Sequence, residues 1–327
     1  MSFRASVTWH DRTSRIALIL LWIVRILVKP ILSIWPSNDF GIGLLGRLSW
    51  VVDKVTPRPR SVQIVDADLG GVPGECIISP KPVDDPLEDA TILYFHGGGF
   101  IFCGPSTHRQ LCVQLALDSG APVYSMDYRQ VPAVPIAGSV HDAMNAYTAL
   151  LETAVDPTRI IVGGDSAGGY LAVKVAEIAA RRGLQRPAAV IGYSPLLSLD
   201  LDDSGHDLEY MKKDAYLPIE ALEKLRPRWL AGQEAIEGEM NPVDADPDLF
   251  PPMFLSAAEF ELTRPDVEDM TERLTDAGKT VETHLWREQI HAWPVLARAL
   301  PEAMELIGLS TRFARRAVVA VDDGRAA

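Results

Sequence analysis

A serine between closely spaced glycines has the clearest capacity for chemistry in this chain. The sequence GDSAGG at 164–169 follows the apolar run 159–163, and a helix-forming segment begins at Tyr170. In a G-x-S-x-G elbow between a strand and a helix, the serine occupies a strained corner and its hydroxyl projects from the sheet. Glycines on either side leave space where a Cβ would clash. The spacing therefore predicts that Ser166 is a nucleophile.

A run of glycines upstream complements this serine. HGGGF at 96–100 follows a second apolar run, 91–95. Consecutive glycines lose much backbone entropy on folding, but they can turn bare N–H groups toward a ligand. Such amides stabilise the oxyanion that develops during acyl transfer. We expect the amides of Gly98, Gly99 and Ala167 to form an oxyanion hole, and His96 to be a structural residue of the loop.

Together these motifs resemble those of the hormone-sensitive lipase family of α/β-hydrolase carboxylesterases. The resemblance rests on HGGGF, on Tyr128-Arg129 followed by Pro132 and Pro135, and on GDSAGG, and it extends from about residue 60 to about 310. It implies an α/β fold with a mostly parallel eight-stranded sheet, flanking helices, a helical cap and hydrolysis of short- to medium-chain acyl esters. The family usually has an acidic residue between the two prolines, which is missing here; we expect this to change local packing only.

The serine needs a base, and the chain has seven histidines. In this fold the order is serine, acid, histidine, which leaves His206, His284 and His291. His284 lies in the alternating run 280–286, typical of a half-buried strand. His206 lies in a polar stretch expected to belong to the cap. His291 follows the strand in a loop, where the family has a similar histidine motif, so His291 is the predicted base.

The acid that orients this histidine is expected after the strand 253–258. The resemblance places the family's aspartate at Glu261, with Glu259 as the alternative. Asp266 is interpreted as a charge in the first turn of the next helix, where carboxylates suit the helix dipole. The predicted triad is Ser166, Glu261 and His291, acting through an acyl-enzyme.

Two other functions stay open at this point. The gibberellin receptors of plants resemble this family but lack the catalytic histidine, so a hydrolase-fold binding protein is one alternative; the presence of His291 argues against it. An acyltransferase that uses the same acyl-enzyme is the other. We expect no metal and no cofactor, because Cys76, Cys103 and Cys112 form no cluster with histidines at metal-ligand spacing.

Composition narrows the partners. The 327 residues carry a formal net charge of −13, which argues against nucleic acid or another polyanion as the partner. The expected partner is a small-molecule ester, as the resemblance implies. Three cysteines are too few for a disulfide framework and indicate a reducing, cytoplasmic location. Whether the chain forms a homodimer stays open.

The alternation of apolar runs and amphipathic segments predicts a mostly parallel sheet. Strands are expected at 61–67, 74–79, 90–96, 122–126, 159–163, 188–193, 252–257 and 280–286. Helices are expected at 107–119, 137–154, 167–182, 218–230, 265–277 and 294–312. The expected organisation is an N-terminal cap segment (1–55), a first core part (56–202), a cap insertion (203–240), a second core part (241–316) and a flexible tail (317–327).

The N-terminal segment has two interpretations. The uninterrupted apolar run 16–24 is shorter than the roughly 18 residues that a spanning helix needs. No small-residue cleavage site follows it, so a signal peptide is not expected. In one interpretation the helix is a cap element whose apolar face covers the active site. In the other, residues 16–35 make peripheral contact with a membrane.

Overall fold

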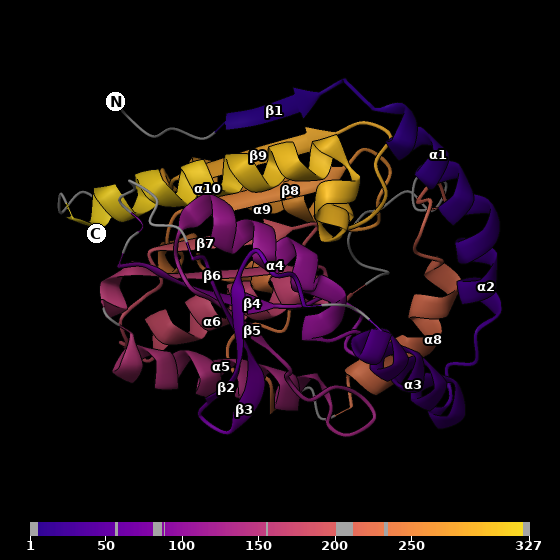
Figure 1. Cartoon of the computed structure of the whole chain (residues 1–327), viewed down its shortest axis with the longest axis horizontal. Coiled ribbons are helices and arrows are strands. Elements are labelled where there is room, and N and C mark those ends of the chain that lie inside the picture. The colour runs from indigo at the N-terminus through magenta and orange to yellow at the C-terminus, as the bar shows by residue number, and fades with distance from the viewer. Residues whose placement is uncertain are drawn as a thin grey trace.

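A nine-stranded sheet forms the centre of the computed structural model, which describes residues 6–55, 58–80, 87, 89–154, 156–200, 212–231 and 235–322 (Figure 1). In this part of the chain the strand order is β1-β9-β8-β7-β6-β4-β5-β3-β2. The expected mostly parallel sheet of the α/β-hydrolase fold is confirmed.

The central strands are parallel and buried. They are β4 (Thr91–Phe95), β5 (Val123–Met126), β6 (Ile160–Asp165), β7 (Ala189–Tyr193), β8 (Met253–Ala258) and β9 (Val281–Trp286). Every residue of β4, β6, β7 and β8 is buried, which explains their continuous apolar sequences. At one edge β2 (Gln63–Leu69) and β3 (Val72–Ile78) form an antiparallel hairpin, and β3 also pairs antiparallel with β5.

Helices cover both faces of the sheet. Side chains of α5 (Ile136–Thr153), α6 (Ala167–Arg181) and α9 (Arg264–Asp276) share one apolar core. Those of α4 (Pro105–Ser119) and α10 (Pro301–Asp322) share the other. Because successive strand residues point to opposite faces, neighbours such as Ile161 and Val162 belong to different cores.

The ninth strand comes from a segment that we had expected to belong to the cap. Residues Ser6–His10 form β1, which pairs in parallel with β9 at the sheet edge. The His10 ring stacks on Trp286, with ring centroids 3.5 Å apart, and Asp11 pairs with Arg287 at 3.0 Å. Ser6–His10 alternates polar and apolar residues as a strand does, but its pairing partner β9 lies more than 270 residues away in the chain, so local sequence does not place it in the sheet.

Two expectations about the C-terminal end were wrong. The helix expected at 294–312 is divided into a 3₁₀ segment, η6 (Trp293–Ala299), and α10, which begins at Pro301. Proline disfavours a helical conformation in the residue before it, so the two segments cannot merge. The expected tail at 317–327 continues α10 to Asp322, with Ala317 and Val318 buried; residues 323–327 lie outside the described part.

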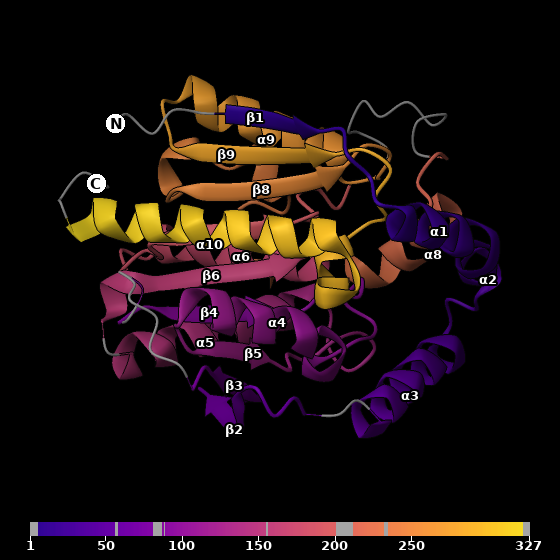
Figure 2. The same ribbon diagram turned by 45° about the horizontal axis from the view of Figure 1, so that its top comes forward.

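Helices outside the sheet gather beyond the carboxyl ends of the strands. In Figure 2 the arrowheads of β8 and β9 point toward α1 (Arg15–Ile23) and α8 (Ile219–Trp229). A π-helical turn, η1 (Val24–Val28), joins α1 to α2 (Lys29–Ile34), and α3 (Asp39–Val55) follows. The sequence 15–34 is thus a single 20-residue helical stretch, longer than the apolar run suggested. By length and composition alone it could cross a membrane.

Candidate active site

Four loops meet at the carboxyl ends of four parallel strands in one half of the sheet. The glycine-rich loop follows β4, Ser166 follows β6, Glu261 lies just beyond β8 and His291 just beyond β9. Because the order β9-β8-β7-β6-β4 makes these strands near neighbours, residues up to 195 positions apart in the sequence reach one place. Ligands of open α/β sheets bind at this edge.

The backbone at Ser166 has the strained geometry that the motif predicts. Its φ of 51° and ψ of −120° lie outside the usual regions for a residue with a side chain. The Ser166 amide donates to the carbonyl of Tyr193 at 3.0 Å, which holds the corner. A Cβ on Gly164 would lie 2.3 Å from the Gly168 backbone, and one on Gly168 would lie 2.0 Å from the Phe95 carbonyl oxygen. Only glycine fits at both positions.

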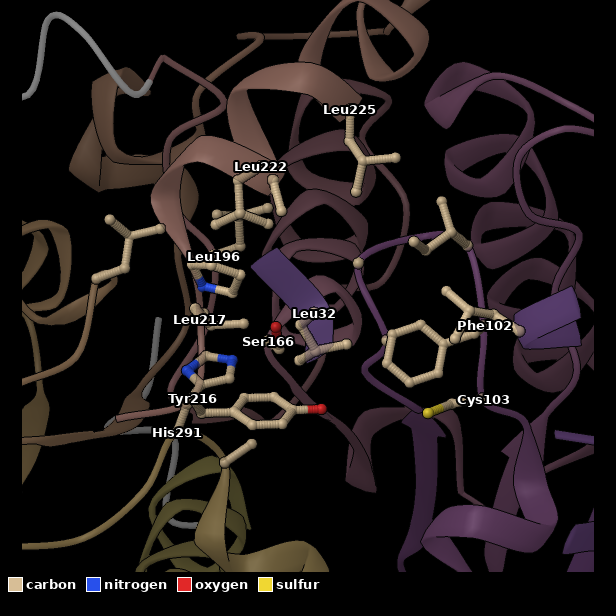
Figure 3. A pocket seen from close by; sticks show the side chains of 18 of the residues that line it. Leu32, Phe102, Cys103, Ser166, Leu196, Tyr216, Leu217, Leu222, Leu225 and His291 are labelled. Atoms are coloured by element: carbon tan, nitrogen blue, oxygen red, sulfur yellow. The ribbon is translucent and has the colours of Figure 1, made fainter. Parts of the chain in front are cut away.

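Ser166 and His291 line the same pocket, a cavity of about 310 Å³. Figure 3 shows the Ser166 hydroxyl facing this cavity, which is surrounded by apolar side chains. They lie on or directly beside α2 and α8, and in the loop between β4 and α4: Leu32, Trp35, Phe102, Leu217, Leu222, Leu225 and Trp229. The volume is at the small end of the range for ligand sites, about 300–1,000 Å³.

The Glu261 carboxylate contacts His291. Nδ1 of His291 lies 3.3 Å from Oε2 of Glu261, and both side chains are almost fully buried. The Ser194 hydroxyl donates to Oε2 at 2.9 Å, and the Thr263 hydroxyl donates to Oε1 at 3.0 Å. Both carboxylate oxygens are therefore held in place. The Ser194 hydroxyl also accepts a hydrogen bond from the amide of Ala292 at 3.2 Å. This bond fixes the loop that carries His291.

The second nitrogen of His291 is available for chemistry. Nε2 is buried and has no hydrogen-bond partner among the residues that the structure describes. Burial opposes protonation of the ring. The hydrogen bond and charge of Glu261 outweigh it, with help from Asp214 and Asp165, so the pKa of His291 is raised above 6.5. The ring of Tyr216 stacks on His291, with centroids 6.3 Å apart (Figure 3).

The glycine-rich loop also lines the pocket. Gly98 and Gly99 have φ values of 118° and 60°, which residues with a side chain rarely adopt. The indole of Trp229, from cap helix α8, donates to the carbonyl oxygen of Gly99 at 2.9 Å. Ala167 is the first residue of α6, and the first amides of a helix have no partner within it. The three amides expected to form the oxyanion hole therefore come from this loop and a helix start.

A buried network behind this loop was not anticipated from the sequence. Asp165 accepts from the Tyr94 hydroxyl at 2.8 Å and from the Gly97 amide at 3.1 Å. Its other oxygen lies 3.1 Å from Nε2 of His108. Asp165 thus joins the elbow to the glycine-rich loop. The signal was present in the position of Asp165 beside Ser166, but no local pattern identifies Tyr94 and His108 as its partners.

His96 and His284 occupy structural positions. His96 stacks on Tyr128 at 4.4 Å, and burial, with the neighbouring His108, lowers the pKa of His96 to about 3. His284 lies on β9, with its ring nitrogens 2.9 Å from His10 and from Glu282. His206 lies outside the described residues.

The structure also shows the positions of Glu259 and Asp266, the other two acidic residues considered near the end of β8. Glu259 is half-buried, two residues before Glu261. Asp266 lies in the first turn of α9 as expected, but it is buried, and burial with nearby Asp269 and Asp244 raises its pKa to about 7. Among the described residues no group of three or more His, Cys, Asp or Glu side chains is placed to hold a metal ion.

Comparison with known proteins agrees with this geometry. A family profile described as the alpha/beta hydrolase fold matches residues 92–295. An acetyl-hydrolase of Streptomyces hygroscopicus is 31% identical over 83% of this chain and 93% of its own length. Esterase LipI of Mycobacterium tuberculosis is 32% identical over 85% and 91%. A crystal structure of an esterase from the bacterial hormone-sensitive lipase family superposes with a TM-score of 0.80 at 27% identity, covering 94% of this chain and 99% of that one.

The fold and the site define an α/β-hydrolase. Within that class the chain belongs to the hormone-sensitive lipase family, and it is an esterase.

Proposed function

We propose that this esterase hydrolyses short- to medium-chain acyl esters through a triad of Ser166, His291 and Glu261. The contact between Nδ1 of His291 and the Glu261 carboxylate, at one edge of a pocket that Ser166 also lines, carries the proposal. Ser194 and Thr263 support it, because their bonds to Glu261 orient the carboxylate that orients the imidazole.

The proposed reaction has two halves. His291 accepts the Ser166 proton through Nε2 as the serine oxygen attacks the ester carbonyl. The amides of Gly98, Gly99 and Ala167 stabilise the oxyanion, and His291 then protonates the departing alcohol. A water molecule, deprotonated by the same imidazole, attacks the acyl-enzyme. The acid is released and Ser166 recovers its proton.

Turnover of p-nitrophenyl esters of increasing acyl length tests the substrate class. Each methylene group that enters the apolar cavity contributes about 0.8 kcal/mol, but those beyond its end contribute little. With a cavity of about 310 Å³ we expect kcat/KM to rise from acetate to butyrate or octanoate and to fall for palmitate. A profile that rises steadily to palmitate contradicts the proposed acyl range but not the triad.

The raised pKa of His291 predicts the acid limb of the pH profile. The base must be neutral to accept the serine proton, so activity falls as pH drops through its pKa. Because that pKa lies above 6.5, half of kcat/KM should already be lost at a pH above 6.5. Glu261→Gln removes the main group that raises it, so the limb should move to lower pH. The limb should stay in place in Glu259→Gln; an unshifted limb in Glu261→Gln contradicts the assignment.

A further inference from the structure

The N-terminal helical stretch exposes a continuous apolar face. Its outward side chains include Ile16, Ile19, Trp22, Ile26, Ile31 and Ile34, which are 53–83% exposed and which we call the apolar stripe. They recur every three to five residues, so they share one side of the helix. Of the 18 consecutive residues that make up its most apolar part, only 11% are buried. Exposed apolar surface of this extent marks an interaction site.

Both ends of the helical stretch are fixed to the same folded core. Before it, β1 pairs with β9, and both the amide and the hydroxyl of Ser14 donate to Glu302 on α10. At its far end, Lys29 donates to the carbonyl oxygen of Asp214 at 2.6 Å, and Leu32 lines the pocket.

These attachments decide how the helix can meet a bilayer. A spanning helix has its ends on opposite sides of about 30 Å of hydrocarbon. The contacts at Ser14 and Lys29 hold both ends of the helix against one domain. A spanning orientation would therefore break the contacts at one of the two ends. In the folded protein the helix can lie only along a surface, with its outer face toward the contacting phase (Figure 2).

The local charge selects the partner. Residues 12–38 contain four cationic side chains, Arg12, Arg15, Arg25 and Lys29, and no acidic one, although the whole chain has 44 acidic and 31 basic residues. The guanidinium of Arg25 lies over the Trp22 ring, 5.6 Å from its centroid. Basic and aromatic residues beside an apolar face suit an anionic lipid surface. A second copy docked on the same face would instead bring two cationic segments together.

We propose that the apolar stripe docks on the surface of a membrane that contains anionic phospholipid, with the helix lying in the interface. The helices of this region also build the pocket, since Leu32 of α2 and Leu45 of α3 both line it. An ester dissolved in the lipid would therefore meet the pocket through the surface that binds the membrane. The substrate part of this inference rests on the proposed function; the docking part does not.

Flotation of the full-length protein with lipid vesicles tests docking. The wild type should float with phosphatidylcholine vesicles containing about one third phosphatidylglycerol, and less with pure phosphatidylcholine. The double variant Ile19→Glu/Ile26→Glu should lose about tenfold or more of this binding, because two carboxylates replace apolar contacts at an anionic surface. Val65→Glu/Val319→Glu is the matched control: it changes exposed apolar residues on β2 and α10 and should float like the wild type.

Two turnover measurements separate docking from catalysis and from misfolding. On soluble p-nitrophenyl butyrate the Ile19→Glu/Ile26→Glu variant should retain wild-type activity, since neither residue lines the pocket. On dioctanoylglycerol held in the anionic vesicles its turnover should fall with its binding. Ser166→Ala should float normally and lose about 10³-fold or more of its turnover of both esters, so the flotation result can be interpreted even if the triad assignment fails.

Three results would overturn the proposal. The first is a wild type that hydrolyses the soluble ester but does not float with anionic vesicles. The second is equal loss of flotation in the matched control. The third is a dimer, measured by sedimentation equilibrium, that Ile19→Glu/Ile26→Glu dissociates, because the apolar stripe would then be covered by a second copy of this chain.

Discussion

Replacing Ser166 by alanine should lower kcat for p-nitrophenyl butyrate by about 10³-fold or more. The change removes the only atom proposed to attack the ester, and no acyl-enzyme can form. A loss of 10³ corresponds to about 4 kcal/mol of transition-state stabilisation. The remaining oxyanion amides and the pocket can still bind the ester, so some rate above water should persist.

Two measurements make this result specific. Ser166 is followed directly by α6, and alanine fills less space than serine, so the fold should survive; circular dichroism and thermal unfolding check this. Mass spectrometry after rapid quenching should detect an acylated Ser166 in the wild type and none in the variant. Retention of more than about a tenth of the wild-type rate would remove Ser166 from the mechanism.

Glu261→Gln is expected to have an effect of comparable size, a loss of about 10³- to 10⁴-fold in kcat. Glutamine keeps the size of the side chain but supplies no charge to the imidazolium that forms in the transition state, and its amide can favour the wrong ring tautomer. The contacts from Ser194 and Thr263 would then hold an amide instead of a carboxylate.

Glu259→Gln provides the matched control. It makes the same chemical change two residues away, at a half-buried side chain that the sequence alone left as a rival. We expect kcat within about threefold of the wild type, as for most substitutions outside the catalytic machinery. If Glu259→Gln were the more damaging of the two, the acid of the triad would have to be reassigned.

Local sequence determined the elements of this site that depend on short-range sterics. The elbow at Ser166 needs Gly164 and Gly168 because their Cβ atoms would collide with the backbone, and that requirement is written in five consecutive residues. The buried parallel strands can likewise be predicted from their continuous apolar sequences. Chain order then limited the base to three histidines, and the resemblance favoured His291.

The tertiary structure decided what depends on residues far apart in the chain. Glu259 and Glu261 could not be separated by spacing; only the packing of the β8 and β9 loops places Glu261 against His291, 30 residues later. The same holds for Asp165 with Tyr94, and for β1 at the sheet edge, whose partner lies more than 270 residues away.

The N-terminal helix shows the same division in one element. Its composition predicted an apolar helix with basic residues, which is a property of consecutive side chains. Whether such a helix spans, caps or lies on a surface depends on where its two ends are held, and Ser14 and Lys29 are held by partners 288 and 185 residues distant. Periodicity records which face is apolar, but only the folded chain determines what that face meets.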